Sequence, residues 1–322
     1  MIVLESAVLA AEVLPEIGGK VGQIHWKPGG CDLLVPPLKP YRTIPTEASW
    51  LDYDTSGMDD CFPNIAAGPY PLPPHQSLVL PDLGEWTHGS WEVLDAGLRQ
   101  MGMRRKGDRL PYRAWKRIRF AGEDTLEFLY RVENHGSTPL RYMWSAHPLL
   151  RVEQKYKLNL PGSSITYRTF PPDEKVHAWP LWQGIDLSCD WIERGTNLKI
   201  FLSGLEEGWC ALLLPEYTVR FRFSLGALPL VGVWLNNDGF PARGASAPFR
   251  CIGVEPCTSP SDLLDDSDAA AYPVLRPGEV ASWTLQMQVV PPEERIGPRE
   301  DLRNHPPKRP PTRNAWADGR GG

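Results

Sequence analysis

Alternation of apolar and polar residues with a period of two is the dominant pattern along this chain. The clearest run is 125–133 (TLEFLYRVE), where apolar side chains fall at the even positions, as expected for a strand with one buried face. The run WKRIRF precedes it, and Ala-Gly-Glu-Asp separates the two, so 115–133 is predicted to be a β-hairpin. Further alternating strands are predicted at 140–146, 219–223 and 283–289.

No stretch keeps a helical period for more than about three turns. The best helix candidate is 260–271 (PSDLLDDSDAAA), with Ser261 or Asp262 as its N-cap. Many short strands, with 29 Gly and 34 Pro available for turns, indicate a sandwich or barrel. No linker and no internal repeat divides the chain, so we predict one large all-β sandwich domain over 1–290. From 291 to 322 the sequence is rich in Pro and mixed charge, which predicts an extended or disordered tail.

Composition removes several classes of function. The formal net charge of the 322 residues is −5, which gives no electrostatic basis for binding nucleic acid. No apolar run approaches the roughly 20 residues of a membrane span, and the apolar N-terminus is interrupted by Glu5 and Glu12, as in a first pair of strands rather than a signal peptide. The six cysteines are scattered, with no Cys-x-x-Cys zinc or redox spacing, and reduced thiols in the cytoplasm are expected.

Two ionisable residues share an unusual local design, because His147 and Glu255 are each expected to end a strand and each precede a proline. A following proline disfavours the helical region for its neighbour, so both backbones should be extended. Cys251 and Gly253 share the face of Glu255, which leaves room there for a ligand. A histidine and a glutamate that meet across a sheet suit acid–base chemistry near neutral pH. Each motif taken alone also fits an ordinary turn at a strand end.

Five segments resemble motifs of the galactose mutarotase (aldose 1-epimerase) superfamily. The segment 144–150 (WSAHPLL) is similar to the family's aromatic-Gly-x-His-Pro-Tyr-Phe motif, and 253–258 (GVEPCT) to its late Glu-Pro-x-Thr motif. The segment 275–279 (LRPGE) resembles the turn before its final strand. Upstream, 15–24 resembles its opening hairpin and 57–65 (GMDDCFPNI) a bacterial version of an early motif. Together the resemblance covers roughly residues 13–290.

The resemblance implies a single antiparallel β-supersandwich and a cofactor-free isomerase that opens a sugar ring and closes it on the other face. Glu255 would take the proton from the C1 hydroxyl, and His147 would donate one to the ring oxygen, from opposite sides of the anomeric carbon. A monosaccharide or related sugar is therefore the expected partner, with no nucleic acid and no membrane.

One departure from the family pattern concerns sugar binding. Leu83 stands where the family often has a histidine that helps to hold the sugar, and a leucine neither donates nor accepts a hydrogen bond. Losing one such contact to a buried oxygen would cost on the order of 1–3 kcal/mol. His75 and His88 flank this position, and either could substitute in space or be an ordinary loop histidine.

Four residues are expected to bind substrate alongside the catalytic pair: Asp60, His88, Trp234 and Asp238. Trp234 is the preferred aromatic platform for a pyranose, because short polar side chains able to hold hydroxyls follow it at 236–238. The same residues fit a plain turn closed by Gly239. Asp59 and Asp60 lie in the family-like early motif, where they either face the cleft or are exposed loop acids.

Three functions stay open from the sequence. An aldose 1-epimerase is favoured, because the presumed acid and base are present. A carbohydrate-binding protein without catalysis is the main alternative, since Leu83 replaces a sugar-binding histidine. A polysaccharide lyase or hydrolase would need a Tyr/His/Arg set or a second carboxylate near Glu255, and spacing alone identifies neither.

Overall fold

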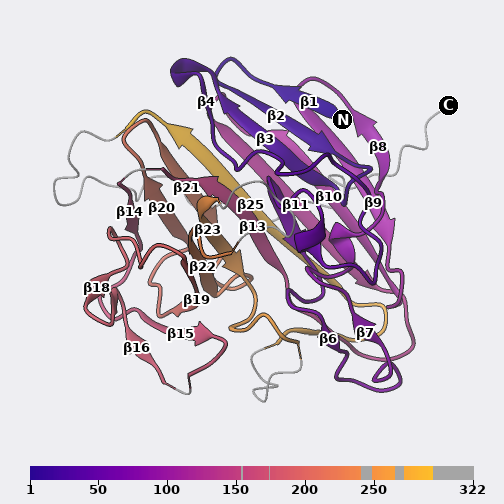
Figure 1. Ribbon diagram of the computed structural model, residues 1–322. Helices are drawn as coiled ribbons and strands as arrows, with labels where there is room; N and C mark the ends of the chain where they lie inside the picture. The colour runs from indigo at the N-terminus through magenta and orange to yellow at the C-terminus, as the bar shows by residue number, and fades with distance from the viewer. Residues whose placement is uncertain (154, 174, 241–248, 265–271, 293–322) are drawn as a thin grey trace.

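Two large antiparallel β-sheets and three two-stranded sheets are present in the computed structural model, which describes residues 1–153, 155–173, 175–240, 249–264 and 272–292. The larger sheet has 11 strands among these residues (Figure 1). Its order is β1 (Ile2–Glu5), β2 (Leu9–Leu14), β3 (Lys20–Trp26), β5 (Met58–Cys61), β13 (Ser145–Arg151), β23 (Arg250–Cys257), β22 (Leu230–Asn237), β19 (Thr196–Ser203), β15 (Thr166–Phe170) and β16 (His177–Ala178), with β4 (Cys31–Asp32) paired to β3.

The smaller sheet has eight strands in the described part of the chain. Its order is β14 (Lys157–Asn159), β20 (Trp209–Leu213), β21 (Thr218–Phe223), β25 (Val280–Val290), β11 (Thr125–Asn134), β10 (Tyr112–Phe120), β9 (Gln100–Lys106) and β8 (Glu92–Ala96). Short two-stranded sheets join β6 (Gly68–Pro69) to β7 (Val79–Leu80), β12 (Leu140–Arg141) to β24 (Val274–Leu275), and β17 (Leu181–Trp182) to β18 (Ile185–Asp186). Within the described ranges, the 3-10 helices are η1 (Lys27–Gly29), η2 (Trp50–Asp52) and η3 (Glu85–Thr87).

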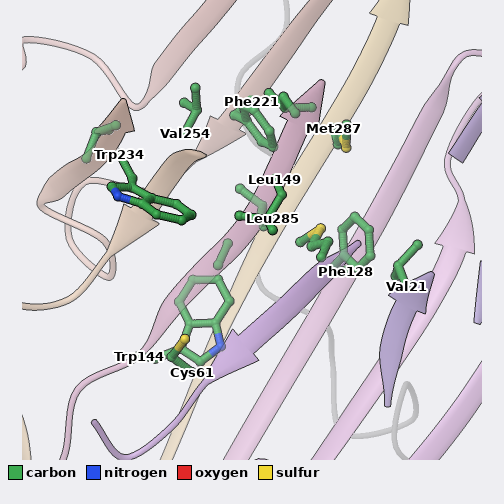
Figure 2. Close-up of a cluster of buried hydrophobic side chains, with 14 of the residues drawn as sticks. Val21, Cys61, Phe128, Trp144, Leu149, Phe221, Trp234, Val254, Leu285 and Met287 are labelled. Atoms are coloured by element: carbon green, nitrogen blue, oxygen red, sulfur yellow. The ribbon is translucent and has the colours of Figure 1, made fainter. Parts of the chain in front are cut away.

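The main hydrophobic core lies between the two sheets. Figure 2 shows buried side chains from the larger sheet, such as Val21 and Val254, beside Phe128, Phe221 and Met287 from the smaller one. Burying one face of each sheet requires period-two alternation in the strands. This is why the pattern along 115–133 predicted a hairpin correctly, and β10 and β11 pair in register from Tyr112↔Asn134 to Phe120↔Leu126.

A buried ion pair also crosses the space between the sheets. Lys116 on β10 donates to Asp60 on β5 at 2.5 Å, and the hydroxyl of Tyr130 on β11 donates to the other oxygen of the same carboxylate at 2.8 Å. Lys116 and Asp60 have side chains only 1% and 3% exposed. The inner face of β5 is thereby attached to two strands of the opposite sheet.

The predicted strands at 219–223 and 283–289 are confirmed as parts of β21 and β25. The expected strand at 140–146 is instead divided, with β12 ending at Arg141 and β13 beginning at Ser145. The intervening amides bond to three different partners, since Tyr142 donates to Pro273, Met143 to Pro63 and Trp144 to the Thr258 hydroxyl.

Two further expectations need revision. His147 and Glu255 do not end their strands, because β13 continues to Arg151 and β23 to Cys257. The helix predicted at 260–271 is absent over 260–264, where the chain forms bends and a turn, and 265–271 lie outside the described residues. The tail prediction for 291–322 falls almost wholly outside them as well. Within the described residues, no helix is long and apolar enough to cross a membrane.

Candidate functional site

The pairing register of two neighbouring strands places His147 opposite Glu255. On either side of these residues, Ser145 pairs with Cys257 and Leu149 with Gly253, and no ladder pair is formed between them. The interruption follows from the sequence, because Pro148 and Pro256 each lack the amide that a regular ladder would use. Two prolines that suggested strand ends thus interrupt the backbone pairing beside the two candidate catalytic residues.

The two side chains meet on the face of the larger sheet that is turned away from the smaller one. His147 Nε2 lies 3.9 Å from Glu255 Oε1, and the side chains are 7% and 0% exposed. His147 Nδ1 and Glu255 Oε1 form no hydrogen bond with any described residue. Buried polar atoms are usually satisfied, so these two atoms are available to a polar ligand.

Two glycines provide the space for the Glu255 carboxylate. A Cβ added at Gly253 would lie 2.7 Å from Glu255 Oε1, and one added at Gly232 would lie 3.3 Å from Oε2. The small residues on this face were expected to leave room for a ligand. Much of that room is instead taken by the glutamate itself and by a lysine that pairs with it.

Lys199, from β19, is the closest charged partner of Glu255. Its ammonium contacts Glu255 Oε2 directly and lies 3.9 Å from Asp262 Oδ1. Burial disfavours the charged lysine, but the carboxylates of Glu255 and Asp262 outweigh that effect and raise the pKa of Lys199. Burial also raises the pKa of Asp262 to about 6, against the opposing effect of Lys199. Lys199 therefore holds one oxygen of Glu255, while the other faces His147.

Two tryptophans cover the imidazole of His147. Trp50, from η2, packs edge-on against it with ring centroids 5.6 Å apart, and Trp234, from β22, lies at 5.9 Å. Burial lowers the pKa of His147 to about 4, although the nearby Glu255 carboxylate acts in the opposite direction. The histidine is consequently neutral at pH 7.

A second buried network lies beside His147. Asp59 pairs with His147 in the ladder between β5 and β13, so both share one face of the sheet. The Asp59 carboxylate accepts a hydrogen bond from Trp50 Nε1 at 3.2 Å and lies 3.1 Å from Lys20 Nζ. Burial raises the pKa of Asp59, partly offset by Lys20. This network fixes the tryptophan that covers the histidine.

Two of the four expected substrate-binding residues lie away from this pair. Asp60 points to the opposite face from Asp59 and is held between the sheets by Lys116 and Tyr130. His88 is 1% exposed, and its ring nitrogens contact the backbone oxygens of Ile44, Pro45 and Asp82. Both residues fasten structural elements together, and we do not retain them among the proposed ligand-binding residues.

The other two expected residues lie nearer the pair. Trp234 contacts His147 as described, and its ring also meets Phe249 at 6.1 Å. Asp238 accepts a hydrogen bond from Arg194 at 2.8 Å and lines a cavity of about 450 Å³ together with Phe249. The rings of Phe249 and Trp234 thus lie between the cavity and His147.

Leu83 lies in the hydrophobic core and is 4% exposed. Neither flanking histidine supplies a replacement polar group at the site, since His88 binds backbone oxygens and His75 packs against Tyr70. Asp82, the residue before Leu83, accepts hydrogen bonds from Ser49 and the Trp50 amide, both at 3.0 Å.

Three contributors to the site were not anticipated: Lys199, Lys20 and Trp50. The two lysines carry a usable signal, because each interrupts an otherwise largely apolar strand, in NLKIFL and GGKVGQI. A lysine buried in such a run needs an acidic partner. Trp50 has no comparable signal, since it lies in a loop.

Comparison with known structures agrees with this architecture. A galactose mutarotase-like protein from Lactobacillus casei is similar with a TM-score of 0.65 and 14% identity, over 90% of this chain and 99% of that one. A galactose mutarotase related enzyme from Lactobacillus acidophilus gives a TM-score of 0.67 and 12% identity over 92% and 99%. A GalM/aldose epimerase homologue from C. elegans gives a TM-score of 0.64 and 14% identity over 91% and 99%.

No protein-family model matches the chain, and no curated protein matches it in sequence. At these identities the structural similarity establishes the fold alone. The chain therefore has a galactose mutarotase-like fold, as the sequence motifs predicted.

Proposed function

We propose that this protein interconverts the anomers of a sugar by acid–base ring opening, with Glu255 and His147 as the catalytic pair. The observation that supports this most directly is the 3.9 Å separation between Glu255 Oε1 and His147 Nε2, two buried atoms that face each other. Neither the carboxylate oxygen nor the other imidazole nitrogen has a hydrogen-bond partner among the described residues.

The separation suits two oxygens bonded to one carbon. In a pyranose, the C1 hydroxyl and the ring oxygen are both attached to the anomeric carbon, so an acid and a base that lie 3.9 Å apart can each reach one of them. Glu255 would take the hydroxyl proton as the C1–ring oxygen bond breaks, and His147 would protonate the departing oxygen. Rotation about the C1–C2 bond and closure with the roles reversed would give the other anomer. Both groups then act from the same side, not from opposite sides of C1.

An NMR time course of anomer interconversion tests the proposal without a chromophore or coupling enzyme. Freshly dissolved α-anomers of common hexoses, pentoses and uronic acids would be mixed with protein, and the rate of β-anomer formation compared with buffer alone. We expect acceleration for at least one sugar, loss of at least about 10²-fold in Glu255→Gln, and a similarly steep loss in His147→Ala. The variant Arg104→Gln, whose partly exposed side chain pairs with Glu92 on the smaller sheet, is the matched control. Absence of acceleration with every sugar would exclude this function.

A sugar-binding protein without turnover is the second candidate, and two observations favour it. Lys199 occupies one oxygen of the presumed base, and the low pKa of His147 makes the imidazolium scarce at neutral pH. This candidate is identified by calorimetric binding of a sugar whose anomers do not exchange faster than in buffer. If the epimerase proposal holds, turnover should instead increase as the pH falls from 7 to 5, because more His147 becomes protonated.

A further inference from the structure

The 450 Å³ cavity next to Trp234 has a charged rim that the proposed chemistry does not use. Three arginines from separate parts of the chain line it: Arg151 at the end of β13, Arg194 just before β19, and Arg250 at the start of β23. Its volume lies within the range typical of small-molecule sites.

The arginines are only partly neutralised by their neighbours. Arg151 pairs with Glu153, and Arg194 donates to Asp238, while Arg250 donates to the backbone oxygen of Glu153 at 3.2 Å. Both acidic residues also line the cavity. Among the described residues that line the cavity, three guanidinium groups and two carboxylates leave one positive charge in excess. Each arginine has five N–H donors, and these bonds to described residues use only some of them.

Other surfaces of the cavity are apolar. Val35 and Leu38 line it, as does the ring of Phe249, which meets Trp234 edge-on. Trp234 in turn contacts His147. A cavity with apolar walls and a rim of arginines, separated from the candidate sugar site by the rings of Phe249 and Trp234, suits a sugar unit that carries a negative charge.

We propose that this cavity binds the carboxylate of an acidic sugar, so that the preferred ligand of the protein is a uronic acid or a saccharide containing one. The inference rests on the proposed function insofar as the ligand is a sugar. The charge balance distinguishes the anion, because one excess positive charge is matched by a carboxylate, whereas a phosphate monoester carries close to two negative charges at pH 7. Planar guanidinium groups recognise a carboxylate with paired hydrogen bonds.

Calorimetry with matched sugar pairs tests the proposal separately from turnover. The pairs are glucuronate with glucose, galacturonate with galactose, and cellobiouronate with cellobiose, which differ only in a carboxylate in place of a hydroxymethyl group. We expect at least one acid to bind about tenfold or more tightly than its neutral counterpart, a preference that weakens with added salt. If no acid binds better than its neutral partner, the inference is wrong. Glucose 6-phosphate binding more tightly than every acid would contradict the charge argument.

Variants then locate the carboxylate. Arg151→Gln and Arg194→Gln should each weaken binding of the acid by about tenfold while leaving the neutral sugar unchanged, because each removes a charged donor from the cavity. Arg104→Gln, whose partner Glu92 lies on the smaller sheet, is the control and should alter neither. An unchanged affinity in both cavity variants would place the acid elsewhere and overturn the proposal. Failure of anomer exchange with every sugar would remove the epimerase function while these binding results would still stand.

Discussion

Lys199 is the charged residue in direct contact with the Glu255 carboxylate. A buried ion pair is often no more stable than an apolar substitute, yet removing one partner leaves an uncompensated charge at a cost of about 3–5 kcal/mol. In this protein the pair also has a geometric role, since Lys199 and Ser145 both contact Oε2 and leave Oε1 directed toward His147.

The variant Lys199→Met is therefore expected to lower the free energy of unfolding by about 3–5 kcal/mol, because Glu255 is left charged and unpaired. The double variant Lys199→Met/Glu255→Gln should recover most of that loss. Urea denaturation of the wild type, both single variants and the double variant measures the coupling energy. Additive effects would show that the two side chains do not interact as described.

At the scale of elements, η2 contributes to the burial of His147. Trp50 covers the imidazole and is itself fastened by Asp59 and, through its backbone amide, by Asp82. Because burial is the main cause of the low pKa of His147, removing the cover should bring the pKa back toward its usual value of 6.5.

We predict that Trp50→Ala raises the pKa of His147 from about 4, measured by NMR titration of the imidazole carbon-bound protons. Stability should change accordingly. Between pH 6.5 and 4 the unfolded chain binds a proton at this histidine and the folded protein does not, so the wild type loses stability as the pH falls through this window. The loss from pH 7 to 5 is about 2 kcal/mol for this group, and Trp50→Ala should lose less. A His147 pKa unchanged by the substitution would refute the covering role of Trp50.

Some of the strands could be predicted from the sequence, whereas the order in which they lie in the sheet could not. Strands buried on one face, such as β11 and β25, were predicted because the core enforces alternation. Pro148 and Pro256 gave an ambiguous signal. In the sequence, a proline that interrupts a ladder within a strand looks the same as one that follows the end of a strand. The approach of Lys199 to Glu255 depends on β19, β22 and β23 lying side by side, and neither spacing nor propensity encodes that order.

Across the whole molecule, β5 joins the core to the site. Its consecutive aspartates point to opposite faces, Asp60 toward Lys116 in the other sheet and Asp59 toward Lys20 and Trp50. The sequence alone does not assign the two faces, because the strand is short and both residues are acidic. The register of β5 thus gives the two neighbouring aspartates, Asp59 and Asp60, different roles.

Substitution at these two positions should separate stability from ligand binding. Asp60→Asn is expected to lower the free energy of unfolding by about 3–5 kcal/mol, because Lys116 is left charged between the sheets, while the affinity of the folded protein for sugar is unchanged. Asp59→Ala should alter that affinity, because it removes the oxygen that accepts the hydrogen bond from Trp50 Nε1. Thermal denaturation and calorimetry on both variants provide the comparison. A loss of sugar binding in folded Asp60→Asn would contradict the assignment of the two faces.

The interruption between β13 and β23 has a mechanical consequence. Where backbone amides do not tie two strands, their spacing is set by whatever bridges the side chains, and here those are His147 and Glu255. A sugar bound to both side chains would bridge the two strands. Ligand binding would therefore reduce the flexibility of the sheet where the ladder is interrupted. Slower deuterium uptake at Val254 on saturation with ligand would reveal this effect, and unchanged uptake would argue against it.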